Sequence, residues 1–201
     1  MAIDIVVKVG GGLLAHRGAL DTTLAAVAAA AQTRNLLVVP GGGPFADAVR
    51  LVDRRLRLTN DAAHWMAILA MEQYAHLIAG RLTGAVLVTQ PLEKVVGAAA
   101  NHGSTPTGSG ARIPVLAPYA WLRDADPLPH SWDVTSDSIA AWVAGQVGAG
   151  QLVLVKPPGA PENNSVDAYF CRVLPAHVKS TVLPVERIEA LETIVIATES
   201  R

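Results

Sequence analysis

The sequence contains little cysteine, little charge and few aromatic residues. Cys171 is the only cysteine among the 201 residues, which excludes an intramolecular disulfide and a cysteine-rich zinc site. Charged residues make up 16% of the chain, the formal net charge is −1, and no run of Lys and Arg is longer than a pair. A broad basic surface for nucleic acid is therefore not expected.

Long apolar stretches are also missing. The alanine-rich runs end well short of the ~20 apolar residues that a membrane-spanning helix needs. No basic segment follows Met1, as it would in a secretory leader. These features favour a cytoplasmic protein that does not enter a membrane.

Apolar residues nevertheless form 51% of the chain, which is enough for a substantial core. Short β-branched runs alternate with longer alanine-rich segments whose apolar residues recur at helical spacing. We expect strands at 3–9, 36–39, 85–88, 114–116, 152–155 and 193–197. We expect helices at 19–33, 44–57, 60–79, 136–144 and 185–191, the third of them capped by Asn60 or Asp61. Loops are expected at 101–112 and 157–166.

Strands this uniformly apolar predict a mostly parallel central sheet with helices on both faces. The fold class that follows is α/β, a three-layer α/β/α sandwich, with a single domain across residues 1–201. In an open parallel sheet, ligands bind outside the carboxyl ends of the strands. The residues at these strand ends are therefore the candidates for function.

Glycine and lysine gather at the end of the first predicted strand. Gly10, Gly11 and Gly12 directly follow it, and consecutive glycines let backbone N–H groups approach a phosphate. Lys8 lies within the strand, where a buried lysine needs a negative partner. A tight turn beside a lysine that reaches solvent explains the same residues, and both interpretations stay open at this point.

A second glycine loop, Pro40-Gly41-Gly42-Gly43-Pro44, follows the second strand and precedes a helix. Bare backbone at a helix N-terminus suits an anion, and a turn alone would need fewer glycines. A dinucleotide-binding fingerprint that starts at Gly10 is disfavoured, because no acidic residue follows the second strand before Asp47. A P-loop is excluded because its motif does not occur in the sequence.

The segment 132–141 combines Asp, Thr and Ser at the start of a predicted helix. Thr135, Ser136 and Asp137 all suit an N-cap, but a cap needs only one of them. Lys156 ends another apolar strand, as Lys8 does. A carboxylate between two lysines would hold both ammonium groups in place. With the glycine loops, these residues suit phosphoryl transfer, in which positioning and electrostatic stabilisation carry nearly all of the catalysis.

Four sequence blocks between about residues 3 and 159 resemble the aspartate/glutamate/uridylate kinase (amino acid kinase) family, in family order: KVGG, PGGGPFAD, TSDSIAAWVA and LVLVKPPG. The resemblance implies an ATP-dependent phosphotransferase, with Mg²⁺ held mainly by the phosphates. It implies that Lys8 stabilises the transferring phosphoryl group, that Asp137 organises the lysines, and that Lys156 contacts phosphate or nucleotide. By the same resemblance, the ATP phosphates face Gly10, Gly11 and Gly12, and the acceptor faces Gly41, Gly42, Gly43, Asp133 and Ser136.

The short length and the segments 64–71 and 132–141 resemble the branch of this family that acts in methanofuran-type cofactor biosynthesis. That branch phosphorylates an aminomethylfuran phosphate to a diphosphate, so the resemblance implies this small-molecule acceptor. Family members commonly self-associate, and we expect a homo-oligomer. The alternative is a non-catalytic ligand-binding or storage protein with the same fold.

His64 lies near the start of the third predicted helix. A partly solvated, structural histidine is the simpler interpretation. An imidazole close to the 41–43 loop would, however, suit a phosphate-bearing acceptor, so His64 is kept as a substrate candidate. The other histidines show no H-x-x-x-H or H-E-x-x-H spacing, and no metal site is expected.

Overall fold

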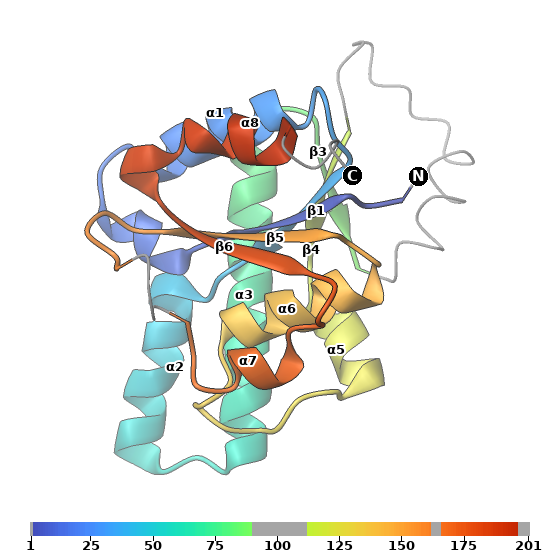
Figure 1. Ribbon diagram of the computed structural model, residues 1–201. Coiled ribbons are helices and arrows are strands. Elements are labelled where there is room, and N and C mark those ends of the chain that lie inside the picture. Colours follow the sequence, from blue (N-terminus) through green and yellow to red (C-terminus); the bar gives the residue numbers. More distant parts are fainter. Residues whose placement is uncertain (1, 90–111, 162–165, 197–201) are drawn as a thin grey trace, which may run out of the picture.

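The computed structural model of the chain describes residues 2–89, 112–161 and 166–196. The strands form one six-stranded sheet in the order β3-β4-β2-β1-β5-β6, and every neighbouring pair is parallel (Figure 1). The strands are β1 (Ile5–Val9), β2 (Leu36–Pro40), β3 (Ala85–Val88), β4 (Ile113–Leu116), β5 (Gln151–Lys156) and β6 (Lys179–Pro184). The parallel sheet predicted from the sequence is confirmed.

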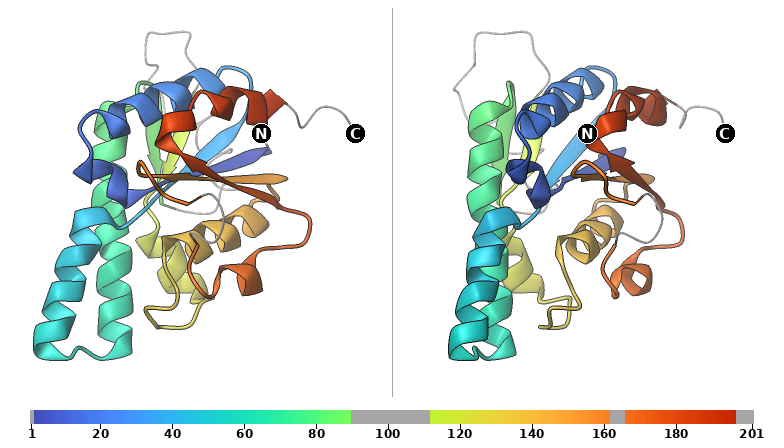
Figure 2. Two further views of the ribbon diagram at one scale, coloured as in Figure 1. Left: turned by 60° about the vertical axis from the view of Figure 1, so that its left-hand side comes forward. Right: turned by 90° about the vertical axis from the view of Figure 1, so that its left-hand side faces the viewer.

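Helices cover both faces of this sheet (Figures 1 and 2). One face carries α1 (Ala19–Ala30) and α8 (Ala190–Ile196), and the other carries α5 (Tyr119–Ala125), α6 (Ser136–Gln146) and α7 (Phe170–Val173). Two short 3-10 helices, η1 (Gly11–Ala15) and η2 (Val185–Arg187), follow β1 and β6. The predicted three-layer α/β/α sandwich is confirmed.

The side chains of the central strands alternate between two cores, one on each face of the sheet. Ile5, Val7 and Val9 of β1 are fully buried in the core beneath α1 and α8. Val6 of the same strand and Leu154 of β5 are fully buried in the core beneath α5 and α6. Lys8 follows Val6 at a spacing of two and therefore points toward this second core.

Helices α2 (Gly43–Leu56) and α3 (Asn60–Arg81) form an antiparallel pair that extends past the edge of the sheet (Figure 2). The N-cap of α3 is Thr59, whose hydroxyl accepts the N–H of Ala62 at 3.2 Å, so the expected cap at Asn60 or Asp61 was one residue or more too late. The first half of α3 packs Trp65 into the second core, and the last half packs Ile78 into the first. One helix thus contributes to both layers.

The C-terminal part of the chain differs from the sequence prediction. The strand expected at 193–197 was wrong, because residues 190–196 form α8, and the helix expected at 185–191 is η2 followed by the start of α8. Ile194 belongs to a run with strand propensity, but Leu191 is fully buried against the α1 layer and tertiary packing overrides that propensity.

Four further elements, η1, α5, α7 and β6, were not predicted. Strand β6 lies at the edge of the sheet and is exposed at Lys179 and Ser180, so it lacks the continuous apolar run of a central strand. Residues 101–111 and 162–165, which belong to the two predicted loops, lie outside the described residues. Among the described residues, no helix combines the length and the apolar character of a membrane span.

Candidate active site

Lys8 and Lys156 project from the same face of the sheet. In the parallel pairing of β1 with β5, Lys8 lies opposite Leu154, and Lys156 is two residues further along β5. Side chains alternate between the faces with a period of two, so Lys156 shares the face of Leu154 and of Lys8. Two ammonium groups from distant parts of the sequence thereby meet at the carboxyl ends of neighbouring strands.

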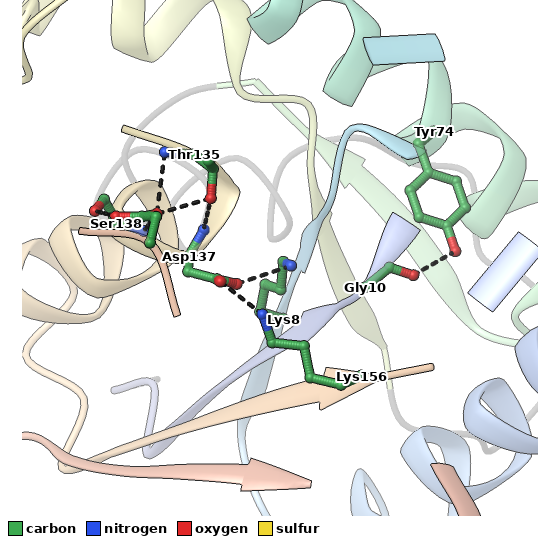
Figure 3. A network of polar contacts seen from close by, with 8 residues as sticks. Lys8, Gly10, Tyr74, Thr135, Asp137, Ser138 and Lys156 are labelled. Carbon is green, nitrogen blue, oxygen red and sulfur yellow. Dashed lines mark hydrogen bonds and ion pairs between the residues drawn. The ribbon is translucent and has the colours of Figure 1, made fainter. Parts of the chain in front are cut away.

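Asp137 in the first turn of α6 lies between the two lysines (Figure 3). Its Oδ1 is 2.9 Å from Lys8 Nζ, and its Oδ2 accepts a hydrogen bond from Lys156 Nζ at 2.6 Å. All three residues are buried, with 5% of Lys8, 4% of Asp137 and 9% of Lys156 exposed. When both lysines are protonated, this trio holds one positive charge in excess, which a bound anion would balance.

The charges of the trio shift the pKa values of its members. Burial alone would raise the pKa of the Asp137 carboxyl, but Lys8 and Lys156 outweigh burial and hold that pKa below its usual range. Burial and repulsion from Lys8 lower the pKa of Lys156, although Asp137 acts against this decrease. A phosphate beside the lysines would relieve their mutual repulsion, so the site is electrostatically suited to an anion.

The two glycine loops pack against each other, backbone to backbone. A Cβ at Gly11 would lie 2.0 Å from the backbone N of Gly43, and a Cβ at Gly41 would lie 2.6 Å from the backbone N of Gly11. Gly43 also has a φ of 53°. Close approach of the two loops therefore explains several of the glycines; the ligand-binding interpretation is not needed for them.

Gly10 occupies a structural position at the base of the first loop. Its N–H donates to Val155 O at 2.9 Å, and its carbonyl accepts the hydroxyl of buried Tyr74 at 3.4 Å (Figure 3). The Gly41 N–H donates likewise to Val9 O at 2.8 Å. The N–H groups of Gly10 and Gly41 are thus already engaged within the protein.

A cavity of about 350 Å³ opens above the trio and the glycine loops. Its wall includes most of the residues predicted from the sequence: Lys8, Gly11, Gly12, Gly42, Gly43, His64, Ser136, Asp137 and Lys156. Gly10, Gly41 and Asp133 do not line it, and Asp133 is exposed to solvent. The tertiary structure therefore brings together residues from the first 64 positions and from positions 136–156.

Sequence reasoning missed the wall that α2 contributes to this cavity. Arg50 lines the cavity, and its Nη1 lies 2.8 Å from Asp47 Oδ1. The Arg50 guanidinium lies over the ring of Trp132 at 4.8 Å from the centroid, and Trp132 Nε1 donates to Asp53 Oδ2 at 2.8 Å. Of these contacts, only the Asp47–Arg50 ion pair could have been predicted from the sequence, by its helical i, i+3 spacing.

His64 lines the cavity and stacks on His130, with ring centroids 4.0 Å apart and planes 17° from parallel. The two nitrogens of His130 are engaged by carboxylates: Nδ1 is 3.1 Å from Asp61 Oδ1 and Nε2 is 2.8 Å from Asp126 Oδ1. Burial and the neighbouring His130 lower the pKa of His64 to about 4, against the opposite effect of Asp126 and Asp61. His64 is therefore a neutral imidazole at physiological pH.

The fold also brings potential metal ligands closer together than the sequence spacing indicated. One donor atom each from His64, Asp126 and His130 lies within 4.8 Å of the others. The two imidazole rings are stacked face to face, however, so their in-plane lone pairs run nearly parallel and do not converge on a common point. In this arrangement the cluster is held by ring stacking and by the contacts of His130 with Asp126 and Asp61.

Solved structures with the same fold include a uridylate kinase and UMP kinases. The uridylate kinase of Archaeoglobus fulgidus superposes with a TM-score of 0.68 at 15% identity, covering 96% of each chain. The UMP kinase of Bacillus anthracis gives a TM-score of 0.68 at 12% identity, covering 98% of this chain and 93% of that one. At these identities the likeness establishes the fold.

A curated relative is the [5-(aminomethyl)furan-3-yl]methyl phosphate kinase of Methanocaldococcus jannaschii, which is 26% identical over 154 residues. The match includes 74% of this chain but 63% of the relative, so the chain spans less than two thirds of that protein's length. Residues 5–157, which include the trio and both glycine loops, match the profile of the amino acid kinase family. The chain therefore belongs to the amino acid kinase family.

Proposed function

We propose that this protein is an ATP-dependent kinase that transfers the γ-phosphoryl group to a small phosphate- or carboxylate-bearing acceptor. The observation that carries the proposal is the buried Lys8–Asp137–Lys156 trio at the base of the cavity. A binding protein needs cations to hold an anion, but it has less need of a carboxylate that fixes two lysines at one point. Phosphoryl transfer depends on such fixed positive charge.

The residues of the cavity fit the phosphates of ATP. Helix α2 begins at Gly43, and the bare backbone of Gly42 and Gly12 lines the cavity. A Cβ at Gly42 would lie 2.4 Å from Ala46 Cβ, and one at Gly12 would lie 3.1 Å from Pro157 Cγ. A long helix N-terminus, bare backbone and two buried ammonium groups together form an anion site.

Each member of the trio has a separate role in this proposal. Lys8 and Lys156 stabilise the negative charge that is spread over the transferring group, and Asp137 holds the two ammonium groups in place. ATP, bound with Mg²⁺, supplies the phosphoryl group. Both oxygens of Asp137 are engaged by lysines, so the phosphates themselves would provide most ligands of Mg²⁺.

The acceptor end of the cavity favours a small molecule with an apolar body. Ala63, Ala67, Ile68 and Met71 of α3 line the cavity together with the lysines and Arg50. A phosphorylated furan of the kind named for the Methanocaldococcus jannaschii relative has an apolar ring of suitable size. We infer that [5-(aminomethyl)furan-3-yl]methyl phosphate, or a close analogue, is the acceptor.

The decisive experiment measures ADP release from Mg-ATP by wild type, Lys8→Ala and Lys179→Ala. The acceptors are [5-(aminomethyl)furan-3-yl]methyl phosphate, UMP, aspartate and glutamate. Wild type and Lys179→Ala, which changes an exposed lysine on β6, are expected to turn over with one acceptor. Lys8→Ala is expected to lose at least ~10²-fold in kcat, because it removes charge stabilisation of the transition state.

Two results would contradict the proposal. Acceptor-dependent ADP release that survives in Lys8→Ala would remove Lys8 from the mechanism. Absence of ADP release from wild type with every acceptor, together with calorimetric binding of ATP, would indicate a binding or storage protein.

A further inference from the structure

The carboxylate of Asp167 accepts hydrogen bonds from the start of α6, which is about thirty residues earlier in the chain. Its Oδ2 accepts the Thr135 N–H at 3.0 Å, the Thr135 hydroxyl at 2.7 Å and the Ser138 N–H at 3.0 Å. Its Oδ1 accepts the Ser138 hydroxyl and the Tyr169 N–H. One carboxylate thus accepts five hydrogen bonds, more than the roughly four lone-pair sites of its two oxygens.

These donors bracket Asp137. Thr135 is the N-cap of α6 and Ser138 is its third residue, so Asp137 lies between the two residues that Asp167 holds. The hydroxyl of Thr135 donates to Asp167. The same hydroxyl oxygen accepts the Asp137 N–H at 3.4 Å, which is long for a capping hydrogen bond. The cap of α6 is therefore supplied largely by Asp167, from outside the helix.

An ordinary N-cap needs one side-chain oxygen and contributes about 1 kcal/mol. Asp167 holds a backbone N–H and a hydroxyl on each side of Asp137. These contacts constrain the helix more than an ordinary cap does, because they fix the rotation of the first turn about the helix axis. Asp137 must reach two lysines on two strands, at 2.9 and 2.6 Å. Catalytic geometry of this kind tolerates displacements of about 0.5 Å.

We propose that Asp167 is a positioning residue that holds Asp137 where it contacts Lys8 and Lys156 together. The proposal rests on the proposed kinase function for its effect on rate. The contacts of Asp167 also join α6 to the segment that follows β5, the strand that ends with Lys156.

The first test compares kcat and KM of Asp167→Asn with those of Asp4→Asn. Asp4 also accepts a backbone N–H, from Asn35 at 3.2 Å, but at the opposite ends of the strands. Asp167→Asn is expected to lower kcat by about 10- to 100-fold and to change both KM values by less than about threefold. Asp4→Asn is expected to retain the wild-type kcat. A wild-type kcat in Asp167→Asn would overturn the proposal.

A double-mutant comparison separates positioning from general stability. If Asp167 acts through Asp137, Asp167→Asn should change the residual activity of Asp137→Asn by less than about twofold. An equal loss of activity in both backgrounds would show that Asp167 acts elsewhere.

A second measurement does not depend on catalysis. The chain has four lysines, Lys8, Lys94, Lys156 and Lys179, so the ε-signals of labelled lysine can be followed one by one by NMR. Asp167→Asn should shift the signal of Lys8, which contacts Asp137, and Asp4→Asn should leave it in place. The signal of Lys156 is not used, because the charge of Asp167 acts on Lys156 directly. An unmoved Lys8 signal would overturn the positioning role even if the wild type has no kinase activity. If Asp167→Asn does not fold, Ser138→Ala removes a single donor and should produce a smaller shift of the Lys8 signal.

Discussion

Lys8 shows how a residue that is unfavourable on its own becomes favourable in a trio. It is buried in a strand whose other members are apolar, and an isolated ammonium group there would be costly. Asp137 removes that cost for Lys8 and Lys156 together, but buried ion pairs seldom stabilise a fold more than apolar residues of the same size would. The trio is therefore better explained by the chemistry of an anionic ligand than by stability.

At His64 the same reasoning gives a prediction for the pH dependence of stability. Its pKa is lowered from 6.5 to about 4, with burial as the largest cause, repulsion from His130 next, and partial compensation by Asp126 and Asp61. A depressed folded-state pKa means that the unfolded chain binds the proton first. The contribution of neutral His64 to the free energy of unfolding is thus fully present above pH 6.5, and it is lost as the pH falls toward 4.

Urea unfolding of wild type and His64→Gln between pH 7.5 and 4 measures this effect. The free energy of unfolding should fall more steeply with decreasing pH in wild type than in His64→Gln. The control is His76→Gln, which changes an exposed histidine of the same helix and should keep the wild-type slope. Identical slopes in all three proteins would contradict the assigned pKa of His64.

The glycine loops are the elements in which structure and function are hardest to separate. Their glycines permit the two loops to touch, and that contact places Gly12, Gly42 and the start of α2 at the cavity. A motif that the sequence suggests as a phosphate cradle is therefore also a packing motif. Both requirements apply at Gly11 and Gly43, which line the cavity and contact each other.

Gly11→Ala is expected to destabilise the protein by about 1–3 kcal/mol, because the added Cβ would overlap the backbone of Gly43 and force the loops apart. The matched control is Gly80→Ala near the end of α3, where a Cβ meets nothing within 4 Å. Gly80→Ala should instead stabilise the helix by about 0.5–1 kcal/mol. Urea unfolding measures both, and a Gly11→Ala variant as stable as wild type would show that the loops do not require this contact.

At the scale of the whole molecule, two cores share one sheet. Strands β1 and β5 contribute side chains to both, and α3 packs into both. This sharing predicts that residues 1–201 unfold as one domain. Self-association and the cytoplasmic location also stay predictions.

The positions of the tryptophans make the single domain testable. Trp65 and Trp121 are buried in the core beneath α5 and α6, Trp142 packs against it, and Trp132 lies at the cavity. Tryptophan fluorescence therefore reports one layer, and far-ultraviolet circular dichroism reports the helices of both. The two probes should give the same urea midpoint. A separation of the midpoints would show that the layers unfold independently.

The sequence by itself predicted five of the six strands, the central helices and most of the candidate residues that line the cavity. Periodicity and uniform apolar character are local signals, and they located β1, β2, β5 and α6 because those elements are buried on both faces or along one stripe. Lys8, Asp137 and Lys156 were singled out as candidates because each interrupts or caps such an element at the edge of the sheet where ligands bind in open parallel sheets.

Only the tertiary structure decided the rest, because the deciding contacts join residues far apart in the chain. Residues 193–196 are helical against their strand propensity, in a helix whose Leu191 and Ile194 pack in the core beneath α1. Asp167 reaches α6 across about thirty residues, and Arg50 meets Trp132 across more than eighty. Local patterns carry no information about such pairs, whereas the register of β1 with β5 alone places both lysines on one face.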